Sequence, residues 1–133
     1  MTNEDVKEAL LKYHDYKRRV ENANLELIAI ITKQTKTGGS IIKIPENPTD
    51  RTHFQLKCIE EKDTINRKVH YWQDMILLAE GFINSLPEPY RSMVRDKYVN
   101  RLCDYKMEVK YHYDRKQIWR IIRKLIERYV EQT

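Results

Sequence analysis

Apolar side chains recur at alternating intervals of three and four residues along the first quarter of the chain. The series is Val6, Ala9, Tyr13, Tyr16, Val20, Ala23, Leu27 and Ile30. Such a heptad-type seam is typical of a helix that packs against a partner helix. Asn3, followed by Glu4 and Asp5, gives this helix a capped and acidic start. The pattern predicts one long helix over residues 3–35.

A second seam with the same spacing predicts another long helix over residues 52–84. Its members are Ile65, Val69, Trp72, Ile76, Ala79 and Ile83. The two helices would form an antiparallel pair within one chain or be shared across a dimer. Two stripes make a thin core for 85 residues, so we expect residues 1–85 to self-associate as a homodimer.

The segment "TKTGGSIIKIPENPTDRTH" separates the two seams and holds two of the three glycines and two of the four prolines. Glycine and proline interrupt regular structure, so the segment predicts a loop at about residues 36–52. The inset "SIIKI" has the composition of a short strand. A lone strand would have to pair with another copy of the chain.

The net charge of +5 is unevenly distributed along the 133 residues. Residues 86–133 hold 12 Lys and Arg against 7 Asp and Glu, whereas residues 1–85 hold 13 of each sign. An excess of positive charge in one segment indicates a polyanionic partner, most simply nucleic acid. The alternative is a solvated basic face that favours solubility.

The sequence lacks the motifs of the common catalytic and metal sites. It has no glycine-rich phosphate loop, no H-E-x-x-H and no nucleophile elbow. The four histidines show no ligand spacing, and Cys58 and Cys103 lie far apart without a C-x-x-C motif. We therefore predict no enzyme, no metal site and no cofactor. No apolar run has the length of a membrane span and the N-terminus has no signal-peptide h-region, so we expect a cytoplasmic protein.

The last third of the chain is predicted to form three shorter helices. "NSLPEPYRSM" precedes a helix expected from Pro87 to Asn100, with both prolines of the motif in its first turn. A short helix over 104–111 and the turn His112–Tyr113 lead to a final helix capped by Asp114. This order predicts a helix-turn-helix. The predicted fold is all-α: a coiled-coil-like helix pair in residues 1–85, then a three-helix helix-turn-helix domain in residues 86–133.

The final helix segregates its apolar and basic residues. Its apolar stripe consists of Ile118, Ile121, Ile122, Leu125, Ile126 and Tyr129. In a helix-turn-helix the first residues of the second helix contact base edges, and further basic residues hold phosphates. The candidate base-reading residues are Arg115, Lys116, Gln117, Trp119 and Arg120. The candidate phosphate contacts are Arg95, Lys97, Lys106, Arg123 and Lys124. The alternative is a basic amphipathic helix that ends an ordinary bundle.

"LPEPYRSMVRDKYVNRLCDYKMEVKYHYDRKQIWRIIRKLIERYV", residues 86–130, resembles region four of sigma factors. It resembles more closely the phage late-transcription regulators of the ArpU and RinA type, from phages and prophages of low-GC Gram-positive bacteria. "SLPEPYR", "KYVNRL" and "YHYDRKQIWRIIRKLI" carry the resemblance. It implies activation of transcription by specific binding to a late-operon promoter region, with host RNA polymerase as a further partner. It also implies that the five base-reading candidates occupy the reading positions.

Three positions depart from the family's pattern. The family usually has Gly at Arg101, Ser or Thr at Cys103, and a small residue at Glu108. An unpaired carboxylate buried between two helices is costly. We therefore expect Glu108 to lie at the edge of the helix crossing or to pair with a nearby Arg or Lys.

Two other functions fit the same layout. A phage small terminase subunit also joins a helix-turn-helix to helical oligomerisation elements, and it would form large rings on packaging-site DNA. A helical interaction protein would bind a protein partner and no nucleic acid. Light scattering separates a dimer from a ring, and a titration with duplex DNA tests the interaction protein.

Overall fold

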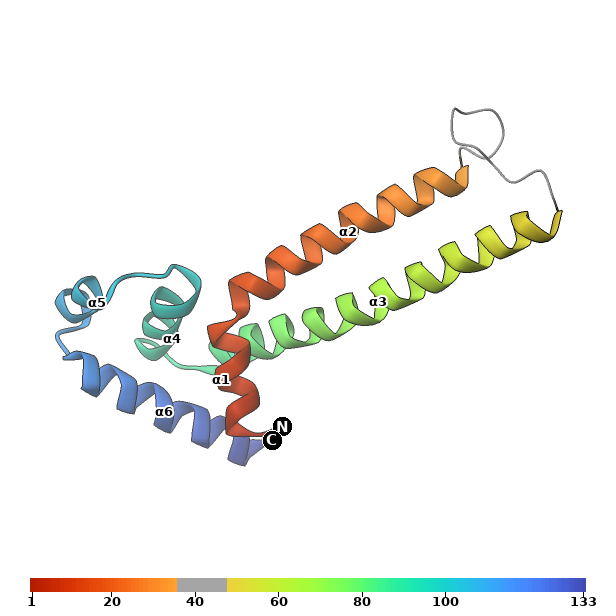
Figure 1. The fold of residues 1–133 in the computed structure, drawn as a ribbon. Coiled ribbons are helices and arrows are strands. Elements are labelled where there is room, and N and C mark those ends of the chain that lie inside the picture. The colour runs from red at the N-terminus through yellow and green to blue at the C-terminus, as the bar shows by residue number, and fades with distance from the viewer. Residues whose placement is uncertain (36–47) are drawn as a thin grey trace. The chain divides into compact units, whose positions relative to one another are not determined.

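The computed structural model describes residues 1–35 and 48–133, with side chains placed in 1–34 and 52–133. All regular elements of these residues are helical, so the fold is all-α, as predicted (Figure 1). They are α1 (Asn3–Leu11), α2 (Tyr13–Thr35), α3 (Pro48–Ser85), α4 (Tyr90–Val94), the π-helical turn η2 (Arg95–Val99), α5 (Asp104–Tyr111) and α6 (Arg115–Gln132). A loop was predicted over about residues 36–52. Residues 36–47, which include "SIIKI", lie outside the described residues, and residues 48–52 belong to α3, so the loop prediction is wrong there.

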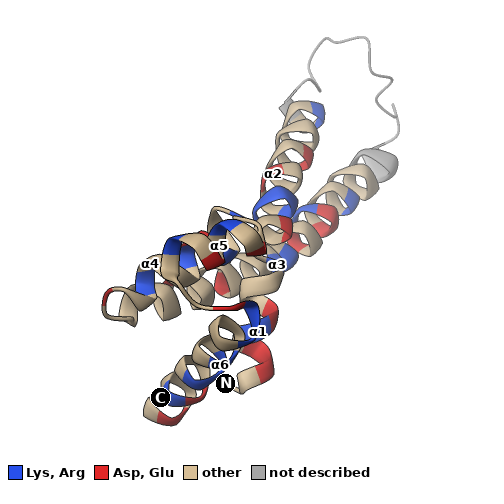
Figure 2. Ribbon diagram, turned by 90° about the vertical axis from the view of Figure 1, so that its left-hand side faces the viewer, with Lys and Arg blue, Asp and Glu red and all other residues tan. Residues whose placement is uncertain are grey.

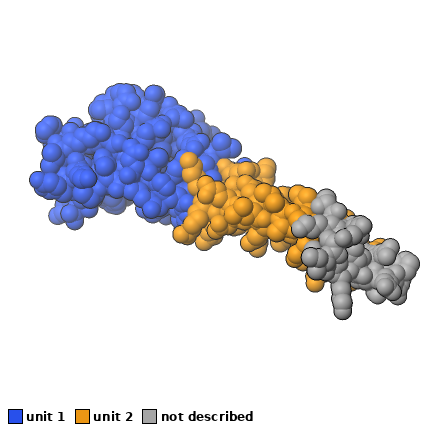
Figure 3. Space-filling model, turned by 90° about the horizontal axis from the view of Figure 1, so that it is seen from above, with its two compact units in different colours: residues 1–16, 74–133 blue, residues 17–73 orange. Residues whose placement is uncertain are grey.

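The chain divides into two compact units, which are coloured separately in Figure 3. Unit 1 consists of residues 1–16 and 74–133, and unit 2 consists of residues 17–73. This division differs from the predicted one after residue 85. The difference arises because α1 packs against α6 and the last turns of α3 share the core of unit 1.

Unit 2 is an antiparallel pair formed by α2 and α3 of the same chain (Figure 1). Its buried apolar residues are Ala23, Ile30, Cys58 and Val69, and all but Cys58 belong to the predicted seams. The Gln34 amide nitrogen donates to Gln55 Oε1 over 3.2 Å, and its oxygen accepts from Lys62 Nζ over 2.8 Å. These contacts join α2 and α3 near the end of α2.

The first predicted helix is two helices, so the prediction of a single helix over 3–35 is wrong at Lys12. Lys12 has φ −99° and ψ 12°, and its N–H donates to the Glu8 carbonyl over 2.9 Å. The residue that caps α1 is Thr2 rather than Asn3: its Oγ1 accepts from the Asp5 N–H, and the Asp5 carboxylate accepts from the Thr2 N–H. The apolar spacing continues unchanged through Lys12, which is why it does not reveal the break.

The core of unit 1 brings together residues from both ends of the chain. The most deeply buried large side chains are Phe82, Leu10, Ile83, Met93, Met107, Val6 and Val94. From α6, Ile118, Ile122 and Ile126 are at most 3% exposed, which confirms that the isoleucine stripe faces the core. Tyr129 extends this packing, with its ring edge-on to Phe82 at a centroid distance of 5.3 Å.

The segment before the helix-turn-helix is shorter and less regular than predicted. α4 begins at Tyr90, after both Pro87 and Pro89, and gives way to the π-helical turn at Arg95. The predicted helix over 87–100 is therefore wrong in its start and in its second half. By contrast, α5 covers the predicted residues 104–111, and α6 begins directly after the predicted cap. No helix in the described part of the chain is long and apolar enough to cross a membrane.

Candidate nucleic-acid interface

The start of α6 is fixed by a capping box at Asp114. Asp114 Oδ1 accepts from the Gln117 N–H over 2.8 Å, and Gln117 Oε1 accepts from the Asp114 N–H over 3.1 Å. The cap predicted from the sequence is thereby confirmed. A glutamine that pairs with adenine uses both its amide oxygen and its amide nitrogen. Gln117 would have to release the Asp114 N–H in order to pair in this way.

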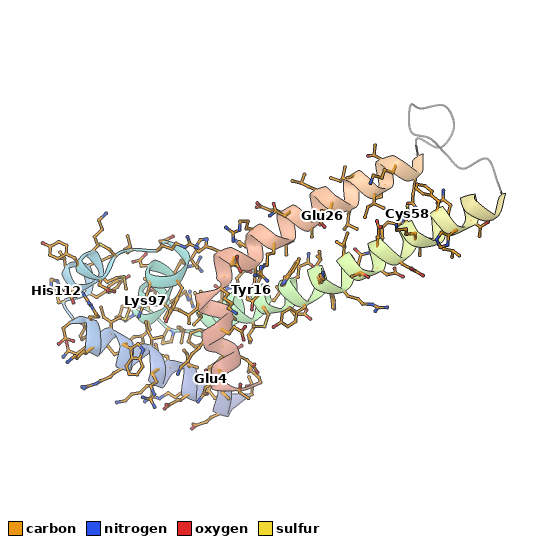
Figure 4. The ribbon with its side chains drawn as sticks, in the orientation of Figure 1. Glu4, Tyr16, Glu26, Cys58, Lys97 and His112 are labelled. Carbon is orange, nitrogen blue, oxygen red and sulfur yellow. The ribbon has the colours of Figure 1, made fainter. Side chains whose placement is uncertain are left out.

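The turn between α5 and α6 is held by two bonds that involve Glu108. His112, labelled in Figure 4, ends α5 in the left-handed region at φ 60°, and its N–H donates to the Glu108 carbonyl over 2.9 Å. Glu108 Oε1 accepts from the Arg115 N–H over 3.0 Å. Glu108 is half-buried and paired, but its partner is a backbone group at the start of α6 rather than the basic side chain expected. It therefore satisfies one of the free N–H groups of that helix start.

Asp96 organises the approach to this turn. It is only 7% exposed, and its carboxylate accepts from Asn100 Nδ2 over 2.8 Å, from Lys110 Nζ over 2.6 Å and from the Tyr111 hydroxyl. Burial alone raises the pKa of Asp96, but the bonds from Lys110, Tyr111 and Asn100 outweigh it and leave that pKa below its usual value. Burial and the bond to Asp96 raise the pKa of Tyr111. Asp96 thus ties η2 to the end of α5.

The candidate base-reading residues all lie exposed on α6. Lys116 and Arg120 form no ion pair with any described residue. Arg115 does: its Nε lies 3.2 Å from Asp104 Oδ2 on α5. Figure 2 shows the Lys and Arg positions of α6 along its length. The basic side of this helix is therefore exposed, while Ile118, Ile122 and Ile126 are buried.

Trp119 occupies the flank of this basic side and is 50% exposed. Its ring lines a pocket of about 200 Å³ together with Leu11 and Ile122 of the same unit. The Arg123 guanidinium lies 5.4 Å from its centroid. This arrangement is partly that of a packing residue.

The five candidate phosphate contacts are not equivalent. Lys106, Arg123 and Lys124 are exposed, and Arg123 also approaches Glu127 Oε1 at 3.4 Å. Arg95 is exposed, but its Nη2 donates to Asn84 Oδ1 over 3.2 Å. Lys97, labelled in Figure 4, is half-buried. Burial lowers its pKa, and the neighbouring Asp104 charge opposes this effect.

Sequence reasoning did not single out Asp96 or Asp104. Asp96 contacts residues 14 and 15 positions further along the chain, well beyond the third and fourth neighbours that a helix brings into contact. In the sequence, Asp104 is an ordinary acidic residue in the first turn of a short helix. Only the fold brings these carboxylates to the residues that they position.

No family model, curated protein or solved structure matches the chain. Within residues 1–35 and 48–133, no group of three His, Cys, Asp or Glu side chains is placed to hold a metal ion. The arrangement around α6 is thus the main basis for inferring a function.

Proposed function

We propose that the chain is a sequence-specific DNA-binding regulator of phage or prophage transcription, of the ArpU and RinA type. The observation that carries this proposal is the division of α6 into a buried and an open side. Ile118, Ile122 and Ile126 anchor the helix in the core of unit 1, and its Lys and Arg residues face solvent. A helix presented in this way fits the major groove of duplex DNA.

The position of each basic residue along α6 supports a division of roles. Arg115, Lys116 and Arg120 belong to the first two turns, which in a helix-turn-helix meet base edges. Lys124 lies further along the helix and Lys106 lies on α5, where contacts with the DNA backbone are expected. Gln117 and Trp119 are secondary candidates, because one is engaged in the cap and the other lines the pocket.

The resemblance supplies the finer part of the proposal. The DNA would be a late-operon promoter region, the effect would be activation, and host RNA polymerase would be a further partner. The site of action would then be the cytoplasm of a bacterial host cell.

Fluorescence anisotropy with labelled duplex DNA tests this function. We expect binding that weakens with salt, since Lys and Arg displace counterions from phosphates. The double variant Arg115→Ala/Arg120→Ala should lose specific binding. The matched control Arg67→Ala/Lys68→Ala removes the same charge from exposed positions of unit 2 and should bind as the wild type does. Specific binding that survives the first double variant would contradict the role given to α6.

We also propose that unit 2 mediates dimer formation. Exposed apolar side chains remain on both of its helices: Leu25, Ile28, Ile31, Leu56 and Ile59 are between 46% and 65% exposed. A second copy that covers such side chains gains hydrophobic stabilisation. Light scattering on wild type and on Ile28→Lys tests this proposal, with a dimer expected for the first and a monomer for the second. Large rings would favour the terminase alternative instead.

A further inference from the structure

Arg115 is held to α5 at two points. Its backbone N–H donates to Glu108 Oε1 over 3.0 Å, and its side-chain Nε lies 3.2 Å from Asp104 Oδ2. The first contact fixes the start of α6, and the second restrains the direction of the guanidinium. No other candidate base-reading residue forms an ion pair with a described residue. Among the cationic candidates Arg115, Lys116 and Arg120, Arg115 is thus the one whose side chain is restrained by an ion pair with a described residue before any partner arrives.

Asp104 pairs with Nε of Arg115, so the other nitrogens of the guanidinium decide which further partners Arg115 can bind. A guanidinium has five N–H donors in a planar fork, and the Nε–H is only one of them. The two terminal nitrogens donate no hydrogen bond to a described residue and remain available for the O6 and N7 acceptors of guanine. Arg115 and Asp104 have side chains that are 71% and 53% exposed. An ion pair so exposed adds little stability, which leaves orientation as its main effect.

We infer that Asp104 is a positioning residue that makes Arg115 specific for guanine, an inference that rests on the proposed DNA-binding function. The Asp104 carboxylate restrains the direction of the guanidinium through this ion pair, so that less side-chain freedom is lost when the fork meets the base. Its negative charge also disfavours close approach of phosphates. Asp104 therefore increases discrimination between sequences and lowers affinity for unrelated DNA.

Asp104 also acts on Lys97, because the charge of its carboxylate opposes the lowering of the pKa of this half-buried amine. Replacement of Asp104 therefore has a second route by which it would affect DNA binding. An effect through Lys97 would change a phosphate contact, which carries no sequence information. It would alter binding to all duplexes alike. An effect through Arg115 would alter the preference at a single base pair, and this difference separates the two routes.

The experiment selects duplexes from a pool with a randomised central segment, using the full-length wild type and its variants. Base preference is then determined at each position of the enriched sequence. The variants are Asp104→Asn, Arg115→Ala and the two combined, and Glu131→Gln is the control for neutralising an exposed acidic residue. Circular dichroism and thermal unfolding establish that each variant is folded.

We expect the wild type to prefer guanine at one position where Arg115→Ala has no preference. A bidentate pair contributes a preference of roughly fivefold to a hundredfold at that position. Asp104→Asn should reduce it at least about threefold, leave other positions unchanged, and bind unselected duplex as tightly as wild type or more tightly. In the Arg115→Ala background, Asp104→Asn should have no further effect on preference.

Two results with Asp104→Asn would overturn the inference and leave the proposed function intact. One is an unchanged preference at every position, and the other is an equal loss at all positions, which indicates a structural role or a route through Lys97. If the wild type itself enriches no sequence, the proposed function fails and the inference fails with it. The wild-type selection therefore distinguishes the two failures.

Discussion

The two units of this protein are stabilised in different ways. Unit 2 repeats one pattern along two helices, with small and apolar side chains such as Ala23 and Val69 buried at regular intervals. The end of unit 1 depends instead on individual polar contacts, of which those of Asp96 and Glu108 are the main examples. A repeating interface tolerates change at single positions better than a set of unique contacts does. Single substitutions among these polar contacts of unit 1 should therefore lower the free energy of unfolding more than single substitutions in unit 2 do.

The largest expected effect comes from removing the Asp96 carboxylate. Asp96→Ala deletes the acceptor for three side chains, and we expect a loss of about 2–4 kcal/mol in the free energy of unfolding. Urea denaturation measures this loss. The control Asp63→Ala removes an exposed carboxylate from unit 2 and should change stability by less than about 0.5 kcal/mol. Equal effects of the two substitutions would remove the contrast between the units.

The Asp96 carboxylate should also make the stability of unit 1 depend on pH in the acidic range. The pKa of Asp96 is lowered in the folded chain from a reference value of 3.8. Its stabilising contribution is therefore complete above the unfolded pKa, near pH 4, and is lost as the pH falls through the lower folded value. Below pH 4, wild type should lose stability more steeply than Asp96→Asn, as followed by thermal unfolding. Parallel profiles would show that Asp96 does not titrate in this way.

A gain in stability is expected at Arg101. This residue has φ 53°, in the left-handed region where a Cβ atom is strained and glycine is not. Arg101→Gly should stabilise the protein by about 0.5–1 kcal/mol, measured by urea denaturation. Arg101→Ala keeps the Cβ atom and removes the charge, so it should give no such gain. A gain with alanine would point to charge rather than to backbone conformation.

A smaller gain is expected at Cys103, the residue that precedes α5. It has the extended backbone of an N-cap, but its side chain makes no capping bond. Cys103→Ser supplies a hydroxyl for the free N–H groups of α5 and should add about 0.5 kcal/mol. Cys103→Ala is the matched control and should add nothing. An identical melting temperature for the two variants would argue against a capping effect.

Periodicity predicted the parts of the fold that repeat. The seams placed Ile30 and Val69 at the contact between α2 and α3, and the isoleucine stripe placed Ile122 in the core. A local cap also sufficed, because Asp114 and Gln117 are only three residues apart. These features depend on neighbours along one helix, and the sequence displays them directly.

Other features depend on residues that only the folded chain brings together. The break at Lys12 interrupts the backbone without changing the apolar spacing. Asp96 contacts Lys110 and Tyr111 across a turn, and Asp104 reaches Arg115 on the next helix. Two positions at which the sequence departs from the regulators that it resembles, Arg101 and Cys103, are a left-handed residue and the N-cap of α5. Their consequences follow from backbone angles that the sequence alone does not give.

The sequence order of the two units has a practical consequence. Residues 17–73 are inserted within unit 1, which is discontinuous and continues at residue 74. A fragment that begins at residue 86 would lack α1, which covers part of α6, and would be a poor substitute for the intact protein. The insertion is also joined to its host by two covalent connections rather than one.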